Sequence, residues 1–166
     1  MRGFKKELAW LGSNLAAGGL GAFLAAFGCV ILWISGGSGW YALKAVQTSL
    51  PPIALLFVLS LLSGGFCGLA AALAVRCAEA RGKSEKDRSP VGHIAAAYLF
   101  GLGWYAVFFC TRLTLFGAVL LAAALPALAA AGIRLWKRCY PAAVWMALIP
   151  AALIDLILLT VTLLAA

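Results

Sequence analysis

The sequence predicts an all-α integral membrane protein, a bundle of five transmembrane helices, from three observations. Hydrophobic residues make up 65% of the 166 residues and charged residues only 11%, and mean hydropathy is +1.05. A soluble domain is about half apolar and a quarter charged, so this chain has too little polar surface to cover a globule in water. The apolar residues form five long stretches, and most of the 18 glycines lie inside them, as is typical of closely packed membrane helices.

The five stretches are each long enough to cross the hydrocarbon core of a bilayer, which takes about 20 residues of helix. They run over residues 8–34, 51–77, 91–110, 113–133 and 141–166. Pro51 and Pro52 open the second stretch, where a missing N–H costs nothing because the first turn of a helix has no partner for it. Pro126 and Pro150 lie inside the fourth and fifth stretches and are expected to kink them.

The distribution of Lys and Arg predicts how the chain is threaded. Eleven of the 13 basic residues lie near the N-terminus, in or beside the connection 78–90, and around residues 134–138. Cytoplasmic segments are the ones enriched in Lys and Arg, so the N-terminus is expected in the cytoplasm and the C-terminus outside. The connection 35–50 then lies outside and 78–90 is a basic cytoplasmic loop. Short loops and this bias suit a bacterial inner membrane.

The same distribution argues against several other functions. The net charge of +8 is spread over short connections rather than gathered in one patch, so nucleic acid is not an expected partner. The five cysteines stand singly and His93 is the only histidine, so no metal site is indicated. Ser38 and His93 are expected on opposite sides of the bilayer, too far apart to act as nucleophile and base. No catalytic residue and no required cofactor are predicted, so the protein is not expected to be an enzyme.

Small residues recur at helical spacing in the first two predicted spans. The two rows are Ala17, Gly21 and Ala25, and Gly64, Gly68 and Ala72. Rows of this kind let helix backbones approach closely in lipid, where van der Waals contact replaces the hydrophobic driving force. They predict packing inside the bundle, with a seam between two copies of the chain, and so a homodimer, as the alternative.

Asp155 is the one acidic residue inside a predicted span. A charged carboxylate at that depth costs about +2.5 to +3.5 kcal/mol even on insertion scales, so Asp155 must be protonated, face a wet cavity or find a donor. Trp104, Tyr105 and Arg112 are the candidate donors. Asp155 is therefore a candidate proton carrier of a small proton-coupled transporter, or else a structural hydrogen-bonding group.

The outer connection 35–50 is the only external segment long enough to do more than turn the chain. It contains three glycines between residues 36 and 39, followed by Trp40 and Tyr41. Trp and Tyr favour the membrane–water boundary, and glycines give the backbone freedom. The segment is expected either to anchor the chain at the interface or to act as a lid over an outward-opening pocket.

Two stretches of the chain resemble the TspO/MBR family, the tryptophan-rich sensory proteins that include translocator protein. Trp40-Tyr41 is followed by Leu43-Lys44, and Pro51-Pro52 begins eleven residues after Trp40, which is the family's spacing between its first and second helices. Trp104, Phe108-Phe109 and Arg112 are similar to the element that ends the family's third helix. The resemblance covers nearly the whole chain and implies the same five spans in the same order.

The resemblance also implies a ligand site. Family positions that line the ligand pocket fall on Ala54, Gly101 and Ile154, where this chain lacks the family's Trp and Asn residues. A flat hydrophobic ligand, such as a tetrapyrrole or a steroid-like molecule, would stack on aromatic side chains. The expected ligand-binding residues are Trp40, Tyr41, Pro51, Ala54, Gly101, Trp104, Tyr105, Phe108, Ile154 and Asp155. The expected function is sensing or transport of that ligand, and a divergent scaffold that has lost the ligand is a further alternative.

Overall fold

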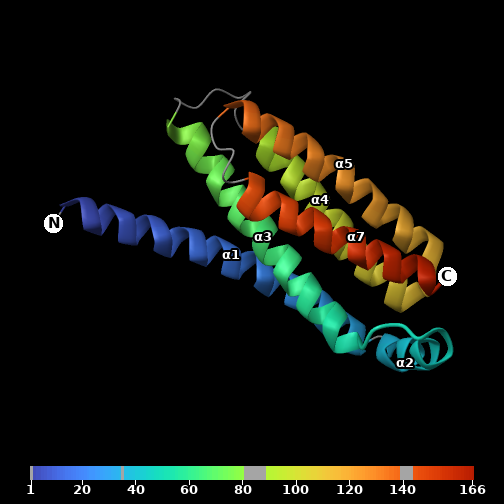
Figure 1. The fold of residues 1–166 in the computed structure, drawn as a ribbon. Helices are drawn as coiled ribbons and strands as arrows, with labels where there is room; N and C mark the ends of the chain where they lie inside the picture. Colours follow the sequence, from blue (N-terminus) through green and yellow to red (C-terminus); the bar gives the residue numbers. More distant parts are fainter. Residues whose placement is uncertain (1, 35, 81–88, 139–143) are drawn as a thin grey trace.

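A computed structural model describes residues 2–34, 36–80, 89–138 and 144–166, and every regular element in these ranges is helical (Figure 1). The elements are α1 (Arg2–Ile34), α2 (Gly37–Thr48), α3 (Ile53–Ala80), α4 (Ser89–Tyr105), η2 (Ala106–Thr111), α5 (Thr114–Arg138), η3 (Val144–Leu148) and α7 (Ile149–Leu164). The segments η2 and η3 are π-helical; η2 continues α4, and η3 leads into α7. The all-α prediction is confirmed.

Within the described residues, four helices are long and apolar enough to cross a membrane, so the chain is a membrane protein by length and composition. They are Ile53–Arg76, Pro90–Thr111, Thr114–Lys137 and Val144–Leu164. A shorter apolar stretch, Asn14–Gly28, lies within the 33-residue helix α1. These segments fall where the second to fifth spans and the first span were expected.

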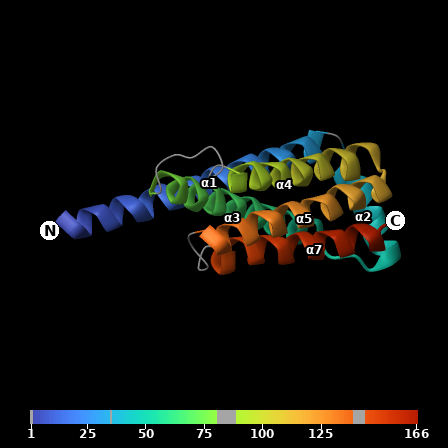
Figure 2. The same cartoon turned by 90° about the horizontal axis from the view of Figure 1, so that it is seen from above.

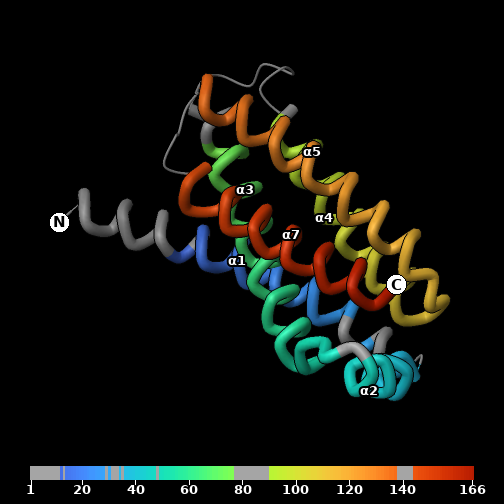
Figure 3. Tube along the Cα trace, turned by 45° about the vertical axis from the view of Figure 1, so that its right-hand side comes forward, coloured from blue at the N-terminus to red at the C-terminus, as the bar shows by residue number. Residues whose placement is uncertain are grey.

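Four long helices form a closed ring among the described residues: α3 packs on α7, α7 on α5, α5 on α4, and α4 on α3. α1 lies beside this ring and packs mainly on α3, with a smaller contact to α4. Figures 2 and 3 show these helices running alongside one another, with α2 at one end of the bundle. The side chains that face into the ring form the protein's core.

Close packing of α1 on α3 depends on the rows of small residues. A Cβ atom placed on Gly64 would lie 2.7 Å from the Gly21 carbonyl oxygen and 2.8 Å from the Ala25 Cβ, and one placed on Gly68 would collide with the Ala17 carbonyl oxygen. The Tyr98 hydroxyl of α4 donates a 3.0 Å hydrogen bond to the Gly21 carbonyl oxygen at the same crossing. The prediction that these rows pack helices within the bundle is confirmed.

The connection between α1 and α3 contains the 12-residue helix α2, a feature that the glycines at its start did not predict. Both flanking residues are left-handed, with φ of 67° at Gly36 and 54° at Ser49. These two conformations turn the chain sharply at each end, because glycine adopts positive φ without cost and other residues rarely do. The helix therefore lies across the end of the bundle, beside η2.

The two prolines of the last spans are accommodated differently. Pro126 lies inside α5, whereas Pro150 falls in the first turn of α7, directly after the π-helical segment η3. Because proline has no N–H to donate, a change of winding at this point lets the chain continue without a broken hydrogen bond in mid-helix. The kink expected at Pro126 stays a prediction, and in the last span Pro150 marks a boundary between two windings.

Candidate functional site

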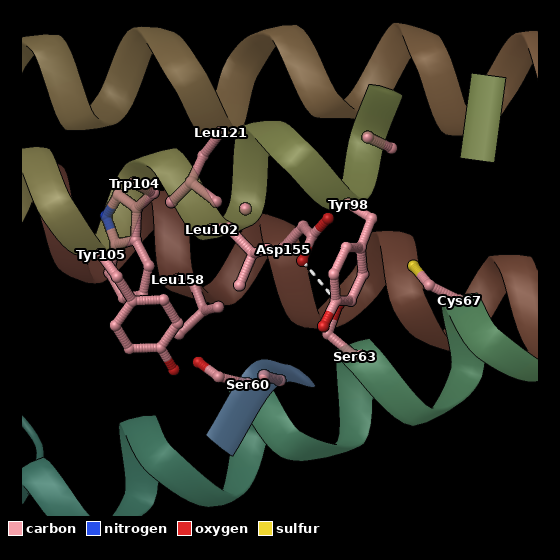
Figure 4. Close-up of a pocket in the computed structure, with 14 residues that line it drawn as sticks. Ser60, Ser63, Cys67, Tyr98, Leu102, Trp104, Tyr105, Leu121, Asp155 and Leu158 are labelled. Atoms are coloured by element: carbon pink, nitrogen blue, oxygen red, sulfur yellow. Dashed lines mark hydrogen bonds between the residues drawn. The ribbon is translucent and has the colours of Figure 1, made fainter. Parts of the chain in front are cut away.

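A small cavity lies inside the ring of helices, around Asp155 (Figure 4). Its polar or titratable lining residues come from α3, α4 and α7: Ser60, Ser63, Cys67, Tyr98, Tyr105 and Asp155. The cavity volume is about 30 Å³, which suits a single water molecule held by polar neighbours. The cavity is the one place among the described residues where a carboxyl group enters the apolar core.

Asp155 is 6% exposed and accepts a 2.9 Å hydrogen bond at Oδ1 from the Ser63 hydroxyl. Figure 4 shows its carboxyl group beside Tyr98, with Ser60, Ser63 and Cys67 on the helix opposite, α3. Ser60 donates instead to the Leu56 carbonyl oxygen, at 2.8 Å within its own helix. The carboxyl group is thus held between α7 and α3 by a neutral donor.

The donor to Asp155 differs from two of those expected. The Trp104 indole N–H donates to the Thr162 hydroxyl oxygen at 3.0 Å, and Arg112 is exposed in the connection after η2. Trp104 was therefore a wrong prediction as the Asp155 donor, because Thr162 lies two helical turns further along α7 and is nearer the aromatic end of the bundle. Ser63 was missed, although its position one turn after Ser60 in an otherwise apolar span was a usable signal.

An aromatic cluster lies between the cavity and α2. It consists of Trp40, Tyr41, Trp104, Tyr105, Phe108 and Phe109. The Trp104 and Phe108 rings stack with centroids 5.4 Å apart, and the Trp40 ring meets Phe108 edge-on at 5.4 Å. Five of these six residues were expected to form a ligand site, and the structure brings all five together from α2, α4 and η2.

The aromatic rings fill the space between them. Tyr41, Trp104 and Phe108 are at most 1% exposed, and Gly37 at the start of α2 lies so close to η2 that a Cβ there would be 2.8 Å from the Phe109 carbonyl oxygen. The cluster is a packed core in this conformation. A flat ligand therefore needs α2 to move away from η2 before it reaches these rings.

The remaining expected residues occupy different environments. Gly101 lines the cavity with Asp155, and Ile154 is buried in the same apolar cluster as the aromatic rings. The Pro51 carbonyl oxygen accepts a 2.8 Å hydrogen bond from the Tyr41 hydroxyl. Ala54 is exposed on α3 and does not line the cavity. The cavity therefore brings Gly101, Trp104, Tyr105 and Asp155 together and leaves Ala54 outside.

Tyr41 fastens α2 to the beginning of α3, and its titration reports that contact. Burial raises the pKa of Tyr41 to about 12 from the 10.0 of an exposed tyrosine. Because the folded pKa lies above the unfolded one, the stabilisation that Tyr41 provides is complete below pH 10 and is lost as the pH rises toward 12. We expect tyrosinate absorbance to show a component with a midpoint near 12 whose amplitude falls by one tyrosine in Tyr41→Phe. A Tyr41 component near the ordinary tyrosine pKa would mean that α2 is not docked on α3.

These features define a class of protein: an all-helical membrane protein with a buried carboxyl group in its core and an aromatic cluster at one end, under a short helix. No protein-family model, no curated protein and no solved structure matches the chain.

Proposed function

We propose that this protein is a TspO-like membrane protein that binds a flat hydrophobic ligand, a tetrapyrrole or steroid-like molecule, for sensing or transport and without chemical turnover. The observation that supports the proposal most strongly is the convergence of Trp40, Tyr41, Trp104, Tyr105 and Phe108. These residues come from separate segments of the sequence, and they meet directly under α2. Aromatic faces suit flat rings because stacked and edge-on contacts both stabilise them.

In this proposal α2 is the lid of the ligand site. The left-handed residues Gly36 and Ser49 bound the helix, and the Tyr41–Pro51 hydrogen bond fastens it in the closed position. Opening releases that hydrogen bond, which contributes about 0.5–1.5 kcal/mol, and also separates the Tyr41 ring from Phe108 and Phe109. Stacking contacts with the flat ligand would replace these ring contacts.

The proposal includes a complete topology. In it α1 crosses the bilayer in addition to the other four spans, as the first of five. The N-terminus then lies in the cytoplasm and the C-terminus outside, in a bacterial inner membrane. Lys and Arg concentrate at the ends of the helices that this topology places in the cytoplasm, which supports the orientation. α2 and the aromatic cluster then face the outer side.

Binding is tested by titrating the purified protein with protoporphyrin and following tryptophan quenching. We expect saturation at micromolar ligand, and about 3–10-fold weaker binding for Phe108→Leu, which keeps an apolar side chain but removes the stacking ring. Phe116→Leu is the matched control, because Phe116 is 67% exposed on α5. It should bind as the wild type does.

Two results would contradict ligand binding at the aromatic cluster. One is an equal effect of Phe108→Leu and Phe116→Leu, which would move the binding site away from the cluster. The other is the absence of saturable quenching, the behaviour of a scaffold that keeps the fold but has lost the ligand.

The hydrogen bond between Ser63 and Asp155 favours a second function, a small proton-coupled transporter with Asp155 as the proton carrier. Ionisable groups inside membrane spans commonly mark proton and substrate pathways. A cavity with room for one water molecule beside the carboxyl group gives a proton a polar partner within the core. The two functions differ in what they require of Asp155, since ligand stacking does not need a titrating group and proton coupling does.

A further inference from the structure

A second hollow of the molecule lies on its outer surface, between α5 and the segment formed by η3 and α7. Its volume is about 600 Å³, which is within the range of ligand-binding pockets. The walls are apolar over most of their length, with Leu128 and Gly132 on α5 facing Val144, Leu148 and Ile149. Gly132 adds to the depth of the groove because it has no side chain; a Cβ there would still be 3.7 Å from the nearest Val144 methyl group.

One end of this groove is aromatic and basic. Trp136 and Lys137 line it, and the Trp136 ring meets the Trp145 ring edge-on, with centroids 6.2 Å apart. Both indoles are at least half exposed, and Arg134 is exposed on the same helix. Exposed Trp side chains mark the level of the lipid headgroups. The groove therefore runs from the hydrocarbon region to a cationic end at the membrane surface.

From this juxtaposition we propose that the α5–η3–α7 groove binds an anionic phospholipid. One acyl chain lies along the apolar walls, and the phosphate group pairs with Lys137 and Arg134 at the end that Trp136 and Trp145 flank. Basic pockets between membrane helices are sites at which acidic lipid headgroups bind. The site is separate from the Asp155 cavity and shares no lining residue with it.

Charge complementarity selects a lipid over a second copy of this chain. The chain has a formal net charge of +8 and only five acidic residues, one of which is the buried Asp155. A second copy would therefore bring mostly positive charge to a groove whose open end is already positive. An anionic lipid neutralises Lys137 and Arg134 and fills the apolar walls at the same time.

The test is native mass spectrometry of the full-length protein in detergent with added phosphatidylglycerol or phosphatidylcholine. We expect the wild type to retain one phosphatidylglycerol and to release phosphatidylcholine. Lys137→Gln should weaken phosphatidylglycerol binding about 5-fold, and the double variant with Arg134→Gln about 30-fold, at roughly 1 kcal/mol per cation. Lys44→Gln makes the same chemical change on α2 and should have no effect.

A second variant examines the apolar walls. Gly132→Leu extends a side chain into the groove and should abolish retention of phosphatidylglycerol, with the helical circular dichroism unchanged. Equal retention of the two lipids, or equal effects of Lys137→Gln and Lys44→Gln, would overturn the proposal. So would a dimer that Gly132→Leu dissociates, since the groove would then be occupied by a second copy.

Discussion

Gly68→Ala is expected to force α1 away from α3 and to destabilise the protein by about 1–3 kcal/mol, the usual cost of overpacking a core. The added methyl group would collide with the Ala17 carbonyl oxygen and lie 3.2 Å from the Gly21 Cα. Both neighbours are backbone atoms of a helix, so neither can move aside as a side chain would. Separation of the helices also removes the Tyr98–Gly21 hydrogen bond.

Gly65→Ala is the matched control on the same helix. A methyl group there lies 3.6 Å from the Gly18 carbonyl oxygen and 3.9 Å from the Ala22 Cβ, which are ordinary contacts. Both substitutions gain the same helix propensity, up to about 1 kcal/mol, so their difference isolates the helix contact. Unfolding in a denaturing detergent titration measures it. If Gly68→Ala is as stable as Gly65→Ala, the close approach of α1 and α3 does not contribute to stability.

The helical segments could be predicted because the bilayer imposes a length on each span. Runs of about 20 apolar residues separated by charged connections identify spans almost independently of packing. The short helix α2 could not be predicted in this way. Twelve residues are too few to form a stable helix alone, and α2 depends on the burial of Tyr41 against Phe108 and Phe109. The contacts that stabilise α2 are therefore tertiary and are not visible in the local sequence. Gly36 suggested a loop, but it occupies only the turn before the helix.

The candidate site was predictable in its aromatic part and not in its polar part. Trp104, Tyr105, Phe108 and Phe109 recur at helical spacing, so they share a face of one continuous helix. Which face of α3 meets α7 is harder to infer, because lipid and core are equally apolar and polarity does not distinguish the two sides. Ala54 was expected to line the pocket and is exposed, whereas Ser63 was not singled out and contacts Asp155.

Asp155→Asn is expected to abolish proton coupling if Asp155 is the proton carrier, while leaving porphyrin affinity unchanged. An amide has nearly the shape of a carboxyl group, and its carbonyl oxygen can still accept the hydrogen bond from Ser63. It does not bind or release a proton near neutral pH, so only coupling is lost. The measurement uses proteoliposomes with a pH-sensitive dye inside and an imposed pH gradient. Protoporphyrin is then added, and its effect on the internal pH is compared between variants.

Ser63→Ala distinguishes two roles of the Asp155 carboxyl group: binding and releasing a proton, and joining α7 to α3 by a hydrogen bond. The hydrogen bond from Ser63 stabilises the charged form of Asp155, and removing it leaves the carboxyl group in place. We expect Ser63→Ala to retain coupling with an altered pH profile, whereas Asp155→Asn falls to the rate of empty vesicles. If Asp155→Asn dissipates the gradient as the wild type does, the carboxyl group serves only to join α7 to α3. The same result would leave ligand binding at the aromatic cluster untouched, because the Trp104 indole is hydrogen-bonded to Thr162 and its ring stacks on Phe108.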